Sequence, residues 1–172
     1  MPISAEASLD VRDAFLSIDF TVKETRYCFC QSKEKDGEAV WQDSCVEIFL
    51  KMLDKSGNYA NFEFNSKGVC YAARGRDRQN RTEFAENEYA QIIRIPSGIS
   101  EDGAFLRWAL SAQIPRELLH TKNDLRTCVI EGNIYKCADL ATKPHYLSLF
   151  SIETPTPDFH RPEFFDILWP PR

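Results

Sequence analysis

The chain has 172 residues, of which 43% are hydrophobic and 27% are charged, and its formal net charge is -5. This length suits one domain spanning residues 1–172, and the abundant apolar residues exclude disorder as the main state. No apolar run approaches the roughly 20 residues of a membrane span. A net acidic chain also argues against broad nucleic-acid binding, which requires a basic face. We therefore expect neither a membrane nor a nucleic acid as partner.

Alternation of apolar and polar residues, which is typical of half-buried β-strands, dominates the chain. Ten segments show strand patterns, in chain order 14–20, 25–31, 45–52, 61–65, 68–73, 89–95, 105–114, 126–136, 146–152 and 164–168. In two of them, Glu47 and Glu63 fall on the face opposite the apolar residues. One short helix is predicted at 115–120, with Pro115 at its first position. Strand spacing and turns rich in glycine predict an all-β, antiparallel β-sandwich with at most one short helix.

The cysteines and the N-terminus bear on the compartment. The six cysteines are Cys28, Cys30, Cys45, Cys70, Cys128 and Cys137. None forms the CxxC spacing of zinc sites, and Cys28 and Cys30 would share one face of a strand, so free, mostly buried thiols are expected. No basic region followed by an apolar stretch marks a signal peptide. These features predict a cytoplasmic protein, although a mature extracellular or periplasmic fragment would show the same features.

Common catalytic motifs are missing from the sequence. Neither a glycine-rich phosphate loop nor a histidine pair at helical metal spacing occurs, so we expect no cofactor, no metal ligand and no catalytic residue. Paired carboxylates could still hydrolyse a glycosidic bond, with candidates Asp43, Glu47, Asp139 and Glu163. Four arginines also gather within eight residues, at Arg74, Arg76, Arg78 and Arg81. They indicate either a solvated loop or a patch that recognises an anion or sugar hydroxyls.

Two stretches have unusual residue choices. Trp41 lies in a polar loop just before a strand that bears an outward Glu47. The second stretch comprises residues 135–139, 144–146 and 157–165 and is rich in aromatic and hydrogen-bonding residues. These stretches resemble the family 9 carbohydrate-binding modules and the related family-9-like, DOMON-like proteins. Their pattern W-x-D-S-x-E-x-F is matched, with one spacing adjustment, by Trp41, Asp43, Ser44, Glu47 and Phe49. The strand at 59–65, the W-x-L…IP strand at 108–115 and the closing FHRPEFF also fit, so the resemblance spans about residues 10–169.

The resemblance implies a β-sandwich that binds the chain end of an oligosaccharide or polysaccharide. In such modules two aromatic rings clamp the terminal sugars while charged and amide side chains bond the hydroxyls. By position Trp41 matches the first ring, Phe159 the second and Glu47 an acidic partner. Arg74, His160 and Arg161 match further polar partners. The resemblance also allows structural calcium, although no dense cluster of aspartates calls for it.

Each of these residues also has a purely structural interpretation. Trp41 could cap the core, Phe159 could plug it, and Glu47 could pair with a lysine across the sheet. Residues 160–163 could form a network that fastens the tail. Trp108 alternates with leucines and is expected in the core.

Non-catalytic carbohydrate binding is the function that these observations favour. The alternatives are a glycoside hydrolase or esterase that uses a carboxylate pair, and a protein-interaction sandwich with a degenerate sugar site. The first predicts two carboxyl groups across one pocket, and the second predicts an exposed apolar patch in place of a cleft. Neither the sugar nor the oligomeric state follows from the sequence.

Overall fold

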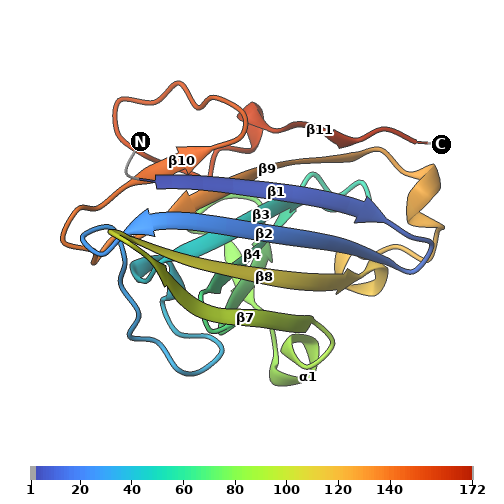
Figure 1. Ribbon diagram of the computed structural model, residues 1–172. Coiled ribbons are helices and arrows are strands. Elements are labelled where there is room, and N and C mark those ends of the chain that lie inside the picture. Colours follow the sequence, from blue (N-terminus) through green and yellow to red (C-terminus); the bar gives the residue numbers. More distant parts are fainter. Residues whose placement is uncertain (1–2, 172) are drawn as a thin grey trace.

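The computed structural model describes residues 3–171, which form two antiparallel sheets packed as a sandwich (Figure 1). The smaller sheet has the order β1 (Ile3–Val11), β2 (Phe15–Thr25), β8 (Phe105–Pro115) and β7 (Ile93–Asp102). The larger sheet has the order β10 (Tyr146–Ser148), β9 (Ile130–Cys137), β3 (Cys45–Lys51), β4 (Tyr59–Asn65), β5 (Cys70–Gly75) and β6 (Arg81–Glu83), and β11 (Asp166–Trp169) also pairs with β9. The helical elements are α1 (Glu86–Tyr89) and 3-10 turns at Val40–Gln42, Arg116–Leu119, Leu125–Thr127 and Pro162–Phe164.

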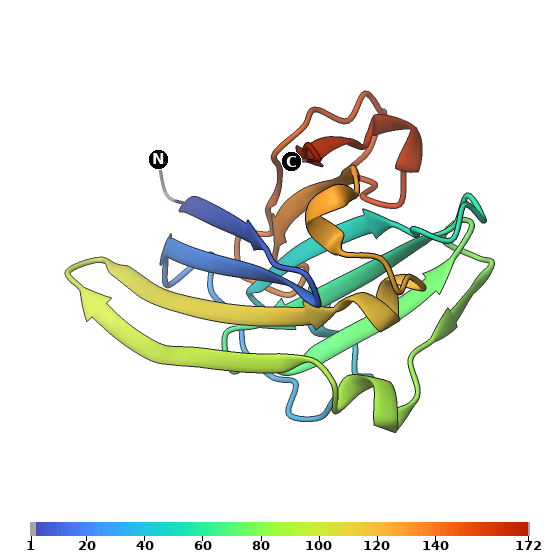
Figure 2. The same ribbon diagram turned by 90° about the vertical axis from the view of Figure 1, so that its right-hand side faces the viewer.

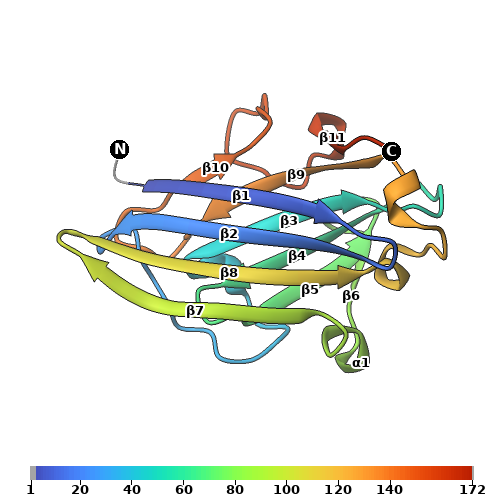
Figure 3. The ribbon, with the colours of Figure 1, turned by 45° about the vertical axis from the view of Figure 1, so that its right-hand side comes forward.

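The main core lies between the two sheets, which are seen as separate layers in Figures 2 and 3. The alternation read from the sequence sends one face of each strand into this core. On β3 the core residues are Val46, Ile48 and Leu50, and on β4 they include Phe62 and Phe64. The all-β sandwich prediction is therefore confirmed, and Glu47 and Glu63 point away from the main core as expected.

The outer face of the larger sheet is covered as well. Every residue of β4, and all of β3 except Lys51, is buried. Two segments far apart in the sequence lie over this face, namely the connection from β2 to β3 and the tail between β10 and β11. The first is tied down at Ser44, whose amide donates to the carbonyl of Cys30. The second is tied down where the amide of Leu149 donates to the carbonyl of Ile134. A polar face covered in this way can enclose a site.

Several predicted boundaries are wrong. β1 was not predicted, because it is an exposed edge strand whose face alternation is lost. The segment 25–31 is a turn and an extended loop, since β2 runs on to Thr25 and ends there. Cys28 and Cys30 therefore do not share a strand face, although all six cysteines are free as expected. The helix expected at 115–120 is a 3-10 turn, and the one α-helix of the described residues is α1.

Candidate functional site

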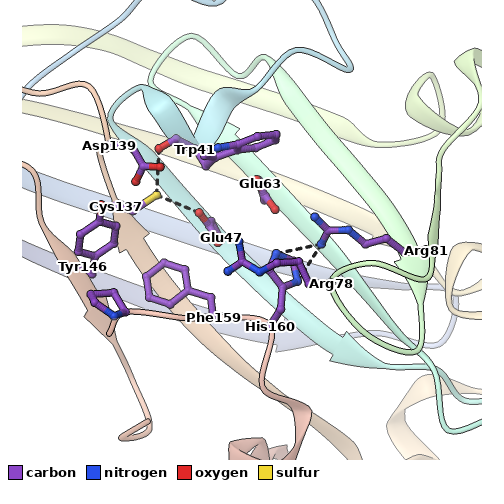
Figure 4. Close-up of a pocket in the computed structure, with 11 residues that line it drawn as sticks. Trp41, Glu47, Glu63, Arg78, Arg81, Cys137, Asp139, Tyr146, Phe159 and His160 are labelled. Carbon is purple, nitrogen blue, oxygen red and sulfur yellow. Dashed lines mark hydrogen bonds between the residues drawn. The ribbon is translucent and has the colours of Figure 1, made fainter. Parts of the chain in front are cut away.

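A cavity of about 260 Å³ opens on the outer face of the larger sheet (Figure 4). Its lining comes from the 3-10 turn Val40–Gln42, β3, β4, the segment 76–81, the end of β9, β10 and the tail. The lining residues are Trp41, Glu47, Glu63, Arg78, Arg81, Cys137, Asp139, Tyr146, Pro157, Phe159 and His160. Four of the six ligand-binding candidates from the sequence, Trp41, Glu47, Phe159 and His160, meet in this one cavity.

The Trp41 wall is held in place by buried polar anchors. Asp43 is fully buried and accepts hydrogen bonds at 2.8 Å from the amides of Ser32 and Lys33 and at 3.0 Å from Asn65. These bonds fix the loop on which the 3-10 turn Val40–Gln42 sits. The Trp41 ring is half-buried and meets Tyr71 edge to face at 5.1 Å between centroids. Trp41 is therefore oriented by its surroundings and still borders the cavity.

The opposite wall comes from the tail. The Phe159 ring stacks on Tyr135 of β9 with 4.2 Å between centroids, and the Tyr135 hydroxyl donates to the Phe159 carbonyl at 3.1 Å. One face of Phe159 is thus packed while the ring still lines the cavity. In Figure 4, Trp41 and Phe159 appear on either side of Glu47. Phe159 therefore fits both the structural and the ligand-binding interpretation, because its ring packs on a small second core and also forms a wall of the cavity.

Two carboxyl groups form the cavity floor. Glu47 and Glu63 are directly opposite each other in the β3–β4 ladder, and each is 2% exposed. Burial raises the pKa of Glu63 to about 8, and burial together with the neighbouring Cys137 and Glu63 raises the pKa of Glu47 well above its usual range. Glu63 accepts a hydrogen bond from Asn61 at 3.0 Å, but its Oε2 atom has no partner. That oxygen is therefore a buried acceptor without a donor among the described residues.

Arginines supply the positive side of the cavity. Arg78 pairs with Asp158 at 2.6 Å, whereas Arg81 forms no ion pair within the described residues. The Arg81 guanidinium instead donates to a ring nitrogen of His160 at 2.8 Å and to the Asn61 side chain at 3.3 Å. Burial and these arginines lower the pKa of His160 to about 3, so its imidazole stays neutral. Hydrogen-bond donors and acceptors thus stand side by side around the cavity.

Two predicted site residues lie outside the cavity lining. Arg74 sits on the core side of β5, where it forms an ion pair with Glu88 and lies over the Phe84 ring at 4.0 Å. Arg161 pairs with Glu163 at 2.7 Å, in keeping with the structural interpretation of the tail. Period-2 alternation explains the difference at Arg74, because its side chain leaves β5 on the face opposite Tyr71. Of the four clustered arginines, Arg78 and Arg81 line the cavity.

Several residues that line the cavity were not among the ligand-binding candidates from the sequence. Glu63 was placed on the outward face but given no role, and Asp139 appeared only as a candidate hydrolytic carboxylate. Cys137 and Tyr146 lay within a stretch of unusual residue choice but were given no role. Asp139 is brought to the cavity because its amide and that of Leu140 donate to the carbonyls of Trp41 and Gln42. Such contacts between distant segments cannot be read from spacing along the chain.

The side chains at this site do not indicate bound calcium. Among residues 3–171, the one group of three or more close metal-ligating side chains of His, Cys, Asp and Glu is Cys45, Glu47 and Cys137. Two thiols do not match the oxygen ligands that calcium takes. Structural calcium stays an expectation of the resemblance. No helix within the described residues is long and apolar enough to cross a membrane.

Comparison with known proteins identifies the family. The model of carbohydrate-binding family 9 matches residues 7–169. The chain belongs to carbohydrate-binding family 9. A solved structure of a candidate carbohydrate-binding protein from Bacteroides uniformis ATCC 8492 superposes with a TM-score of 0.82 at 27% identity, covering 95% of this chain and 76% of that chain. No curated protein matches this chain. The family confirms the fold and supports carbohydrate as the class of ligand for this family 9 module.

Proposed function

We propose that this family 9 module binds the terminal sugars of a glycan chain in the cavity between Trp41 and Phe159, without transforming them. The single observation that supports this most is that Glu47, Glu63 and Arg81 line the same cavity as the aromatic rings of Trp41 and Phe159. A sugar ring has an apolar C–H face that packs on aromatic rings, and a rim of hydroxyls that each need a polar partner. The cavity supplies both kinds of surface.

The size of the cavity favours a chain end over a long chain. Its volume of about 260 Å³ is slightly below the roughly 300–1,000 Å³ of pockets for drug-sized ligands. One or two sugar rings suit such a space. The Oε2 of Glu63, which has no hydrogen-bond partner, and the guanidinium of Arg81, which forms no ion pair within the described residues, would then accept from and donate to ring hydroxyls. Glu47, between the two walls, would bond a further hydroxyl.

Isothermal titration against a panel of mono- and oligosaccharides tests the proposal. We expect Trp41→Ala to lower the affinity for the best ligand by at least about tenfold. Loss of the stacking on this ring and of the area that the ring buries against a sugar removes more than about 1.4 kcal/mol of binding free energy. Tyr27→Ala removes an exposed aromatic ring outside the cavity and serves as the matched control. Unchanged affinity in Trp41→Ala would remove this ring from the site, and failure of the intact protein to bind any glycan would overturn the proposal.

A carboxylate-pair hydrolase is the second candidate, because Glu47 and Glu63 line one cavity from adjacent strands. It predicts turnover of chromogenic glycosides that is lost in both Glu47→Gln and Glu63→Gln. Binding without turnover would exclude it. The interaction-sandwich alternative predicted an apolar patch in place of a cleft, and the cavity with its polar lining favours sugar binding over it.

A further inference from the structure

Three metal-ligating side chains meet at the end of the cavity floor. Cys45 and Cys137 are directly opposite each other in the β3–β9 ladder, and Glu47 is two residues further along β3 on the same face. Their sulfur and oxygen atoms lie within 4.8 Å of one another, and each residue is at most 2% exposed. Neighbouring strands thus fix the set by backbone register, which holds ligands more rigidly than loops do.

The hydrogen bonds at this cluster are weak for such a buried set. The Cys137 thiol lies 3.0 Å from Glu47 Oε1 and 3.4 Å from the Trp41 carbonyl, and the Cys45 thiol contacts the Cys137 thiol and lies 3.7 Å from the Val46 carbonyl. Thiols are weak donors, so these contacts satisfy the carboxyl group poorly. The nearby cation, Lys136, is directed to the opposite face of β9, where it pairs with Glu24.

The donor set matches a thiophilic divalent cation. Two sulfurs and one carboxylate oxygen are ligands that zinc accepts at about 2.3 Å and about 2.0–2.2 Å. In a tetrahedral site such ligand atoms are about 3.5–3.8 Å apart, so small side-chain rotations suffice to bring this cluster together. Glu47 and Cys137 also line the cavity, which gives an ion a route of entry and leaves one coordination position open to it.

We propose that Cys45, Glu47 and Cys137 bind one zinc-class divalent cation, with the fourth position open to the cavity. Binding replaces the thiol protons, which pass to solvent, and no oxidation or reduction is involved. Because a carboxylate has two oxygens, Glu47 can ligate the ion with one and face the cavity with the other. The inference does not depend on sugar binding, so either proposal can fail without the other.

Titration of the reduced, full-length protein with Co²⁺ tests the site. A tetrahedral cobalt–thiolate centre gives a sulfur-to-metal charge-transfer band in the near ultraviolet and strong visible bands. We expect both to saturate at one equivalent and to disappear when Zn²⁺ is added. In the wild-type protein, bound Zn²⁺ should also slow alkylation of Cys137 more than that of Cys128. Absence of the thiolate bands at saturating Co²⁺ overturns the proposal.

Variants locate the ion. Each of three substitutions, Cys45→Ser, Cys137→Ser and Glu47→Gln, should weaken Co²⁺ binding by at least roughly 10- to 100-fold. Loss of a residue that only hydrogen-bonds to a metal ligand already lowers metal affinity by that factor. Cys128→Ser, at a free cysteine outside the cluster, is the control and should bind as the wild type. Circular dichroism checks that each variant is folded, and the alkylation experiment needs no variant. Thiolate bands that persist in both Cys45→Ser and Cys137→Ser would place the ion elsewhere and overturn the assignment.

Discussion

Among individual side chains, His160 links the tail to the larger sheet. Its Nδ1 atom lies 2.8 Å from the Tyr59 hydroxyl of β4, and Arg81 donates to the same ring. A ring nitrogen that accepts a bond from a guanidinium has to be unprotonated. Burial and the adjacent positive charge therefore lower the pKa of His160 to about 3, although Asp158 acts in the opposite direction.

This shift predicts how the free energy of unfolding depends on pH. In the unfolded chain histidine titrates near its ordinary pKa of about 6.5. Between about pH 6.5 and 3 the unfolded state binds more protons at this position, so stability falls as the pH falls through that window. We expect His160→Gln to reduce the slope of the free energy of unfolding against pH by up to about 1.4 kcal/mol per pH unit. Urea unfolding between about pH 4 and 7 measures this slope. His120→Gln, at an exposed histidine outside the cavity, is the control, and an unchanged slope in His160→Gln would contradict the prediction.

At the level of strands, a buried ionic cluster joins the two sheets. Glu24 of β2 pairs with Lys136 of β9 at 3.1 Å, and both side chains are almost fully buried. Glu24 also accepts from the indole N–H of Trp108 at 2.7 Å, and Lys136 contacts His145 at 2.8 Å. Trp108 lies in the core as predicted, but its polar edge fixes one sheet on the other. Such a pair aligns strands because misplacing either partner leaves a buried charge.

Removing one partner of this pair should be costly. We expect Lys136→Met to lower the free energy of unfolding by about 3–5 kcal/mol, because Glu24 would stay buried without its cation. Lys51→Met breaks the exposed pair with Glu131 and should cost less than about 1 kcal/mol. Urea denaturation of both variants measures the difference. Equal losses in the two variants would contradict the role of the buried pair, and addition of Glu24→Gln should recover part of the loss in Lys136→Met.

For the molecule as a whole, the site exists because chain segments cover a sheet face that no second sheet covers. The tail is held at its ends, where Leu149 donates to β9 and Phe159 stacks on Tyr135. Between these points, the amides of residues 151–158 donate no hydrogen bond to other described residues. Backbone without such bonds opens at low free-energy cost. The tail wall is therefore the part of the cavity that a ligand can order.

Hydrogen–deuterium exchange tests this coupling. Peptides covering residues 151–161 should exchange fast in the free protein and several-fold more slowly once a glycan that binds in the cavity is present, since Pro157, Phe159 and His160 line it. The β7–β8 hairpin belongs to the other sheet and should not change. Equal exchange of the tail with and without a bound glycan would show that the ligand lies elsewhere.

The pattern along the chain was informative wherever a strand has one apolar face. It placed Val46, Ile48 and Leu50 inward and Glu47 outward, and the structure agrees. It failed for β1, whose mostly exposed residues carry no such pattern. It also failed to choose between arginines, because Arg74 and Arg81 have the same chemistry and differ only in the face and strand from which they project.

Period-2 alternation and the Trp41–Phe49 motif were enough to assign the all-β class, the family and the outward face of β3. These are local properties, since side-chain direction on a strand depends only on the backbone within a few residues. The composition of the cavity depended on the tertiary structure, which brings Phe159 and His160 more than a hundred residues along the chain to Trp41 and Glu47. These residues come together because of the register between β3, β4 and β9 and because of the path of the tail. Neither is encoded in the spacing of any single motif.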